Sequence, residues 1–185
     1  MNTVVTSKED ILKTSRELIQ REGWSAVNIR SVAAACGVSV GSIYNYFDSK
    51  SALVGATVES VWCEIFHRPK DGAVFQDTQA CITWLYERME YGCKQYPVFF
   101  TLHSLGFMGE DKSDGRRKMQ QTWQHILEGL HSVLQRDTKV RPDAFTEQFT
   151  AEKFADLLFS LMLSALLRQD YDPTAVLEIV RRTLY

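Results

Sequence analysis

One short stretch of the sequence combines polar side chains whose types and spacing could bind another polar molecule. The stretch reads CGVSVGSIYNYF, and its polar members are Ser39, Ser42, Tyr44, Asn45 and Tyr46. Solvent-facing helix surfaces usually carry Lys, Glu or Arg, and none of these occurs here. An asparagine amide can pair with two edge atoms of adenine, and hydroxyl groups can bind phosphate oxygens. The stretch therefore favours a nucleic-acid contact over an ordinary helical corner, which stays open as the alternative.

Two glycines and two valines shape the backbone of this stretch. Gly37 can adopt the positive φ that a sharp reversal between two helices requires, and Val38 can fill the corner. Gly41 lies inside the following helix, where it costs about 1 kcal/mol relative to alanine. That cost is understandable if another molecule must approach the backbone closely, with Val40 able to contact a thymine methyl group. The pattern predicts a helix-turn-helix whose second helix faces DNA.

Apolar spacing predicts the helices that must hold this surface in place. They span residues 8–22, residues 29–36, a short segment that follows Ser39, and about residues 50–66. Asn28 and Ser39 are suitable N-caps for the second and third helices. Ile43, Tyr46 and Phe47 fall at i, i+3 and i+4, which predicts a third helix reaching Phe47. Helices of two turns are marginal alone, so we expect the first and fourth helices to support the two short ones.

The remainder of the chain is also helical in pattern. We expect helices over about residues 82–96 and 119–134, a restart at Pro97, a polar loop at 109–115, and a last helix capped by Asp172. No alternating strand pattern bounded by turns occurs. The predicted fold class is all-α, with an N-terminal three-helix head that contains the helix-turn-helix and a second helical layer in the C-terminal part.

Composition limits the kinds of protein that this chain can be. Its 185 residues are 45% hydrophobic and carry a formal net charge of -2, as in a globular protein without general attraction to anionic polymers. The longest apolar run, residues 154–167, is shorter than the about 20 residues that span a bilayer. The N-terminus lacks a basic start followed by an apolar run, so we expect a cytoplasmic protein without a membrane partner.

Cysteine and histidine spacing gives little support to a metal or redox site. The four cysteines lack a close CxxC pair, and without an export signal we expect them to be reduced thiols. Cys63 and His67 lie at i, i+4, a spacing that suits two metal ligands, but no third ligand is recognisable. We therefore expect no metal and no cofactor.

The segment NIRSVAAACGVSVGSIYNYFDSKSAL resembles the N-terminal signature of the TetR/AcrR family of bacterial transcriptional regulators, and the likeness extends over residues 8 to about 62. The shared features are a capped helix, Gly-Val-Ser at the turn, Gly-x-x-Tyr-x-Tyr-Phe in the recognition helix, and a following Lys. Asn28 stands where Thr is usual, Cys36 replaces a common Ala, and Val40 replaces a frequent Lys or Arg. The base read by Val40 is therefore expected to differ.

This resemblance implies a homodimer with a DNA-binding head and a larger ligand-sensing bundle. It implies a helix-turn-helix domain over residues 1–50, a linking helix over about 50–66, and a ligand-binding and dimerisation domain over 51–185. By the same resemblance Asn28 and Lys50 would hold phosphates. The side chains that would face the major groove are Ser39, Val40, Gly41, Ser42, Tyr44, Asn45 and Tyr46.

One helix in the C-terminal half is apolar nearly all round, over residues 154–166. Such a helix must be covered on more than one side, either as a central core helix or by the bundle on one side and a second subunit on another. Under the second interpretation the dimer interface consists of Leu158, Leu161, Met162, Ala165, Val176, Val180 and Leu184.

Aromatic residues gather in the middle helices, as they do in apolar ligand pockets. The predicted pocket residues are Trp62, Phe66, Trp84, Tyr91, Phe100, His103, Phe107 and Trp123. For each of them, packing in an ordinary core is the alternative interpretation. The sequence does not identify the small-molecule effector.

These observations predict a dimeric, sequence-specific DNA-binding transcriptional regulator, a repressor that a small-molecule ligand releases from its operator. The rival hypothesis is a helical adaptor that binds only protein. An enzyme is disfavoured, because the four histidines lie in no recognisable catalytic motif. The first 60 residues hold equal numbers of basic and acidic side chains, so we expect DNA affinity to depend only modestly on salt.

Overall fold

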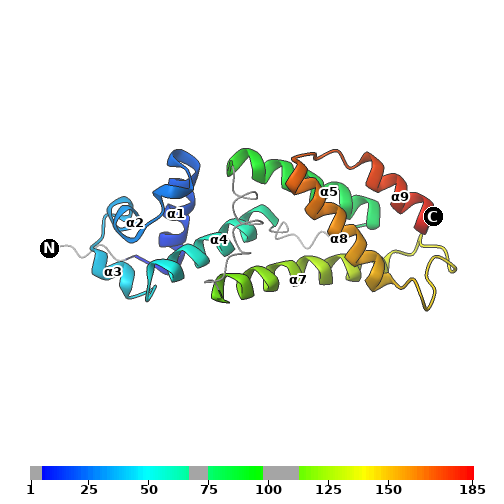
Figure 1. Cartoon of the computed structure of the whole chain (residues 1–185), viewed down its shortest axis with the longest axis horizontal. Helices are drawn as coiled ribbons and strands as arrows, with labels where there is room; N and C mark the ends of the chain where they lie inside the picture. Colours follow the sequence, from blue (N-terminus) through cyan, green and yellow to red (C-terminus); the bar gives the residue numbers. More distant parts are fainter. Residues whose placement is uncertain (1–5, 67–74, 98–112) are drawn as a thin grey trace.

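Helices form all the regular secondary structure in the part of the chain that the computed structural model describes. That part comprises residues 6–66, 75–97 and 113–185, and side chains are described there except for residues 113–122. No strand occurs in these ranges, so the predicted all-α class is confirmed. Figure 1 shows a head of short helices joined by one long helix to a helical bundle. The elements are α1 (Lys8–Glu22), the 3₁₀ turn η1 (Trp24–Ala26), α2 (Ile29–Cys36), α3 (Val40–Tyr44), α4 (Lys50–Phe66), α5 (Thr78–Gln95), α7 (Ser113–Arg136), α8 (Ala151–Arg168) and α9 (Thr174–Leu184).

The head consists of α1, α2, α3 and the first half of α4. Ser7 begins α1 with a reciprocal pair of hydrogen bonds to Asp10, which satisfies N–H groups that the helix itself leaves without partners. The four helices meet on apolar side chains that are fully buried: Ile11 of α1, Val32 of α2, Ile43 of α3 and Leu53 of α4. The two short helices are therefore held by burial against their longer neighbours, as their length requires.

The turn between α2 and α3 has the expected geometry. Gly37 ends α2 with φ 67°, in the left-handed region, and the Val38 N–H donates to the Ala33 carbonyl at 3.0 Å. The third helix is shorter than predicted, since α3 ends at Tyr44. The chain then turns through a hydrogen bond from the Tyr46 N–H to the Ile43 carbonyl, which still leaves Phe47 buried against the head.

The bundle is built from α5, α7, α8, α9 and the second half of α4. Helix α7 packs on α8 and α4, while α9 packs on α5 (Figure 1).

Two helix boundaries in the bundle differ from those predicted from the sequence. The expected polar loop at 109–115 is helical from Ser113 onward, and its first residues lie outside the described part. Helix α9 begins one residue late, with the Asp172 carboxylate accepting from the Thr174 N–H at 2.9 Å. The predicted restart at Pro97 also runs into residues outside the described part.

The predicted dimer residues require a correction. Leu158, Met162, Ala165, Val176, Val180 and Leu184 are all buried within one chain, and Leu161 is only half-buried. The six buried side chains already fill the space between α8, α9 and the rest of the bundle, so only Leu161 of the predicted set is available to a second subunit. The apolar side chains that α8 and α9 leave exposed are Leu157, Leu167 and Ile179.

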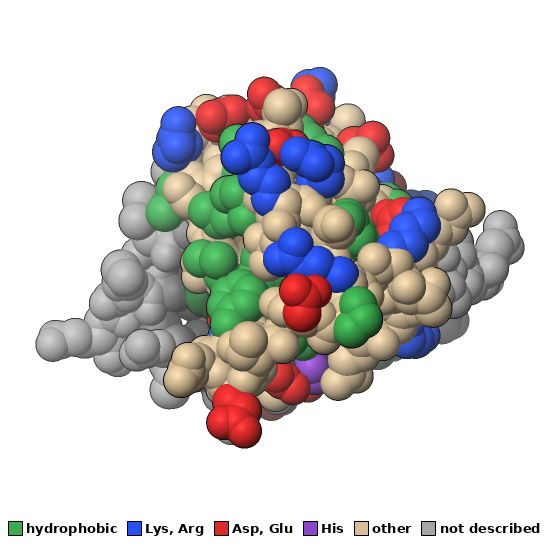
Figure 2. All heavy atoms as spheres, turned by 90° about the vertical axis from the view of Figure 1, so that its right-hand side faces the viewer, with side chains coloured by type: hydrophobic (Ala, Val, Ile, Leu, Met, Phe, Trp, Pro, Cys, Tyr) green, Lys and Arg blue, Asp and Glu red, His purple; other side chains and the backbone are tan. Residues whose placement is uncertain are grey.

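The end of the bundle remote from the head carries mixed charge. In Figure 2 basic side chains on this face lie beside acidic ones. Glu178 binds both Arg181 and Arg182, at 2.8 and 2.6 Å, and Lys139 binds Asp77 at 2.7 Å. This end is therefore not a basic surface of the kind that attracts nucleic acid. Among the described residues no helix is both long and apolar enough to cross a membrane.

Candidate nucleic-acid interface

The burial pattern of α3 decides which of its side chains are available to a partner. Ile43 is 0% exposed, and it fixes the rotation of this short helix against the head. Val40 and Tyr44 therefore point outward, and Tyr44 is 49% exposed although its ring is large and partly apolar. Asn45 is exposed beside them. The structure thus brings together, on one outer face, a methyl-bearing, a hydroxyl-bearing and an amide-bearing side chain.

The start of α3 presents backbone N–H groups beside this face. The Ser39 hydroxyl accepts from the Ser42 N–H at 3.1 Å and lies 2.9 Å from the Ser42 hydroxyl, so these two serines cap the helix. The N–H groups of Val40 and Gly41 make no hydrogen bond to any described residue. A Cβ atom added at Gly41 would meet only the Ser39 hydroxyl, at 3.7 Å. The packing of this chain therefore does not require glycine at position 41.

Two predicted contact residues already have partners inside the head. The Asn28 side-chain oxygen accepts from the N–H groups of Arg30 and Ser31, both at 3.0 Å, and so serves as the cap of α2. The Tyr46 hydroxyl donates to the Thr6 carbonyl at 2.5 Å, which ties the segment before α1 to the end of α3. Both residues position the surface through these bonds. The Asn28 amide NH₂ could still donate to a phosphate, whereas the Tyr46 hydroxyl has used its one hydrogen and can only accept.

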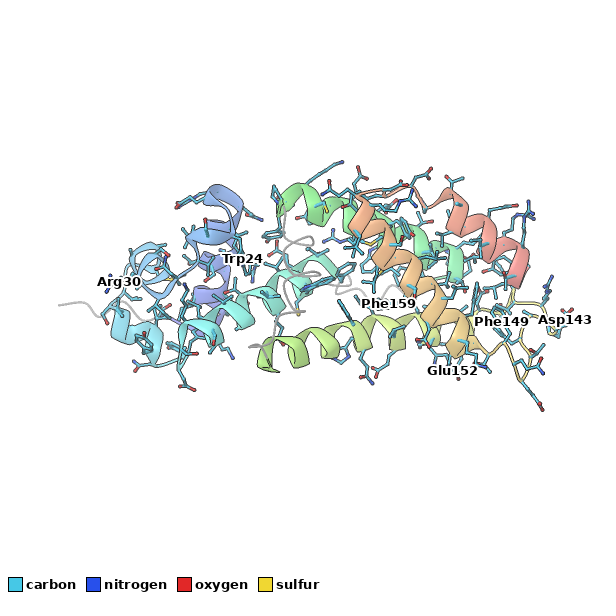
Figure 3. All side chains as sticks on the ribbon, in the orientation of Figure 1. Trp24, Arg30, Asp143, Phe149, Glu152 and Phe159 are labelled. Carbon is cyan, nitrogen blue, oxygen red and sulfur yellow. The ribbon has the colours of Figure 1, made fainter. Side chains whose placement is uncertain are left out.

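Two cations frame the same end of the molecule. Lys50 is exposed as the first residue of α4, as expected from the sequence. Arg30 is exposed in the first turn of α2, and Figure 3 shows it at the end of the head away from the bundle. Sequence reasoning counted Arg30 only as a charge. Its place two residues after the Asn28 cap was the available signal, since the first turn of a helix projects with the free N–H groups.

The second candidate site is a cavity of about 670 Å³ between α4, α5 and α7. Three predicted pocket residues line it, namely Trp62, Phe66 and Trp84, together with Phe75. The rings of Trp62 and Phe66 are stacked with their centroids 5.4 Å apart. The thiol of Cys63 also faces this cavity, and its pKa is raised by burial and then by the nearby Glu59 carboxylate.

The other predicted pocket residues do not join this cavity in the described part of the chain. Tyr91 is exposed, with the Arg88 guanidinium 4.2 Å above its ring. Trp123 packs instead against Phe159 of α8 at 5.9 Å between centroids, and Figure 3 shows Phe159 on the α8 ribbon. The remaining three, Phe100, His103 and Phe107, lie outside the described residues. No group of three potential metal ligands occurs among the described side chains.

Comparison with known proteins agrees with this arrangement. Residues 11–57 match the family model described as bacterial regulatory proteins of the tetR family. The uncharacterized HTH-type transcriptional regulator YerO of Bacillus subtilis (strain 168) is 42% identical over 52 residues, which are 28% of this chain but only 18% of YerO.

Solved structures share the fold over nearly the whole chain. A putative TetR transcriptional regulator from Streptomyces avermitilis superposes with a TM-score of 0.66 at 17% identity, covering 98% of this chain and 100% of that one. BioQ in complex with its double-stranded DNA operator superposes with a TM-score of 0.53 at 14% identity, covering 90% of this chain and 87% of that one. Residues 11–57 thus match the tetR family model, and the whole chain shares the all-helical fold of these solved regulators.

Proposed function

We propose that this protein is a dimeric transcriptional regulator whose α3 helix reads operator DNA in the major groove. The observation that carries the proposal is the outer face of α3. It exposes Val40, Tyr44 and Asn45 next to a bare backbone at Gly41, although none of these residues is a usual choice for a solvated helix surface. In this proposal Asn45 and Val40 contact base edges, and the Tyr44 hydroxyl contacts a phosphate oxygen.

Phosphate contacts would come from helix N-termini and a few placed cations. The unpartnered N–H groups at the start of α3 can donate to one phosphate, and Arg30 and Lys50 can bind others. Because residues 1–60 carry no net charge, these contacts would be few. DNA attachment would then rely on directed hydrogen bonds more than on counterion release.

A homodimer would place two such heads on one operator. The exposed apolar side chains of α8 and α9, Leu157, Leu167 and Ile179, with half-buried Leu161 between them, form the surface that we assign to the partner subunit. Exposed leucine and isoleucine side chains on neighbouring helices favour burial against a second copy. Two α3 helices would then address half-sites about 34 Å apart or a multiple of that distance.

Regulation would come from the cavity between α4, α5 and α7. Its aromatic walls suit an apolar small molecule, and α4 connects it directly to the head. We propose that such a ligand releases the protein from its operator, which makes the protein a repressor. A helix-turn-helix domain over residues 1–50, a linking helix over about residues 50–66, a ligand-binding and dimerisation domain over residues 51–185, and a cytoplasmic location belong to the same proposal.

The test begins by selecting the genomic DNA fragments that the purified protein binds in the presence of random competitor DNA. Fluorescence anisotropy on a selected fragment should show at least about tenfold weaker binding for Tyr44→Ala and for Asn45→Ala, since each loses about 1–3 kcal/mol of contact. Gln20→Ala, which changes an exposed side chain of α1, is the control and should bind as the parent protein does. If the parent protein selects no fragment, or if both variants bind unchanged, the adaptor hypothesis replaces this one.

A further inference from the structure

The last turn of α4 is bound to two other helices through a single carboxylate. Glu64 forms an ion pair with Arg16 of α1 through one oxygen, and its other oxygen accepts from the Tyr96 hydroxyl at the end of α5, at 2.7 Å. Arg16 also donates to the Ser60 hydroxyl one turn earlier on α4. Glu64 therefore connects the first helix of the head with the bundle.

This connection is partly sheltered from water, so salt screens it less than it screens an exposed ion pair. Tyr96 is fully buried, and the side chains of Arg16 and Glu64 are largely covered. Burial and then the neighbouring Glu64 carboxylate raise the pKa of Tyr96, which keeps the phenol protonated as a donor. Both oxygens of the carboxylate thus have a directed partner, an arrangement with a defined geometry.

A second contact holds the same turn from the side of α5. The Arg88 guanidinium donates to the Glu64 carbonyl at 3.1 Å and to the Ile65 carbonyl, two of the carbonyls that the end of α4 leaves without helical partners. The end of α4 is thereby fixed between α1 and α5. It cannot move relative to α5 without breaking these bonds.

The other face of this turn lines the cavity. Trp62, Cys63 and Phe66 contact the cavity space, and Glu64 lies between them in sequence but points to α1 and α5. A molecule bound in the cavity would therefore contact the same turn of α4 that holds Arg16. Because α1 packs on both α2 and α4, a movement of this turn would reach the head through Arg16.

We propose that Glu64 is a positioning residue, which transmits occupancy of the cavity to the DNA-binding head through Arg16 and Tyr96. This inference rests on the proposed function of the head. Glu64→Gln should break the transmission, because the amide carries no charge to pair with Arg16 and replaces one of the two acceptor oxygens by an NH₂ donor. Tyr96→Phe should weaken it partially, because the ring and the Arg16 ion pair remain.

The exposed thiol of Cys63 allows a probe of known chemistry to be placed in the cavity. N-(1-pyrenyl)maleimide adds to a thiol by forming one carbon–sulfur bond, while its ring double bond becomes single and takes up the thiol proton. The background variant Cys36→Ala removes the half-buried thiol of the head, and a further Cys63→Ala reports any labelling of Cys81 or Cys93. Labelling is done at about pH 8, because burial raises the pKa of Cys63.

DNA affinity of labelled and unlabelled protein is then compared for each variant on a selected fragment. In the Cys36→Ala background we expect labelling to weaken binding about tenfold, within the usual range of coupling between sites. Adding Glu64→Gln should reduce this effect to less than about threefold. Adding Glu90→Gln, which changes an exposed carboxylate of α5 that pairs with Lys94, should leave the full effect.

The comparison within each variant separates transmission from simple support of the fold. If Glu64 had a purely structural role, Glu64→Gln would lower the DNA affinity of labelled and unlabelled protein by the same factor. The ratio of the unlabelled to the labelled affinity would then stay about tenfold. That result would overturn the proposal, as would a labelled Cys36→Ala protein that binds DNA with unchanged affinity. If unlabelled protein bound no DNA, the proposed function itself would be refuted first.

Discussion

Replacing Asp137 should test how the bundle is closed at the end far from the head. Asp137 is 7% exposed, at the end of α7, and one of its oxygens accepts from the N–H and the hydroxyl of Thr78, both at 2.8 Å. The same oxygen accepts from the Tyr185 hydroxyl at 2.5 Å, and the other accepts from the Lys139 N–H at 3.0 Å. One carboxylate thus joins the start of α5, the end of α7 and the segment after α9.

The expected loss in the free energy of unfolding follows from these four hydrogen bonds. Hydrogen bonds to a charged group contribute about 1.5–3 kcal/mol each, and a buried N–H without a partner costs about 1–3 kcal/mol. Because the four bonds share one group, their losses do not add, and we expect Asp137→Ala to lower the free energy of unfolding by about 3–4 kcal/mol. Asp137→Asn keeps the shape but loses the charge and one acceptor, so it should cost about half as much.

The stability that Asp137→Asn loses should be smaller at low pH than at neutral pH. Burial raises the pKa of Asp137, but the hydrogen bonds from Tyr185, Thr78 and the Lys139 backbone outweigh it, so the pKa lies below its ordinary value. A carboxyl whose pKa is lower in the folded state contributes its stability above the pKa of the unfolded chain and loses it as the pH falls through the folded value. The difference between Asp137→Asn and the parent protein should thus be complete at pH 7 and shrink below about pH 4.

Urea unfolding followed by circular dichroism gives the free energies, at one protein concentration because dimerisation would add to stability. Asp143→Ala is the matched control, since Asp143 is exposed in the segment between α7 and α8 and should cost less than about 0.5 kcal/mol. A cost below about 1 kcal/mol for Asp137→Ala would refute the reasoning. So would a cost for Asp137→Asn that stays constant down to pH 3.

Three further predictions concern the turn, the dimer and the head. Gly37→Ala should lower the melting temperature by about 2–4 °C, because alanine is strained by about 1 kcal/mol at φ 67°; an unchanged temperature would contradict this. Leu157→Glu combined with Ile179→Glu should convert a dimer to a folded monomer in sedimentation velocity, since both side chains are exposed at the surface assigned to the partner. A dimer that persists would place the interface elsewhere. The logarithm of DNA affinity should fall with the logarithm of salt concentration with a slope clearly shallower than about -10, since residues 1–60 carry no net charge. A slope that steep would contradict this explanation.

Local signals in the sequence predicted most of the head. The Asn28 and Ser39 caps, the left-handed Gly37 and the inward Ile43 depend on residues within a few positions of one another, and all four occur as expected. The end of α3 was predicted wrongly. Helical spacing also fits residues in a following turn, so Phe47 is buried although the helix has already ended.

The residues of the candidate sites could be predicted from the sequence only in part. Spacing shows which side chains share a face of one helix, but not which neighbouring helix covers that face. Trp62, Phe66 and Trp84 do converge on one cavity, whereas Trp123 lies on the side of α7 that meets α8. Arg30 was counted as a charge, and only its place in the head made it a candidate contact.

Apart from the end of α3, the sequence by itself determined the helices of the head, their caps and the polar outer face of α3, because these follow from interactions between near neighbours along the chain. Only the tertiary structure decided which side of α8 is covered by α7 and which side stays exposed at Leu157 and Leu167. It alone brought Arg16, Glu64 and Tyr96 into contact. Contacts between distant segments depend on how whole helices pack, and packing is fixed by the sum of many side chains from all the helices that meet.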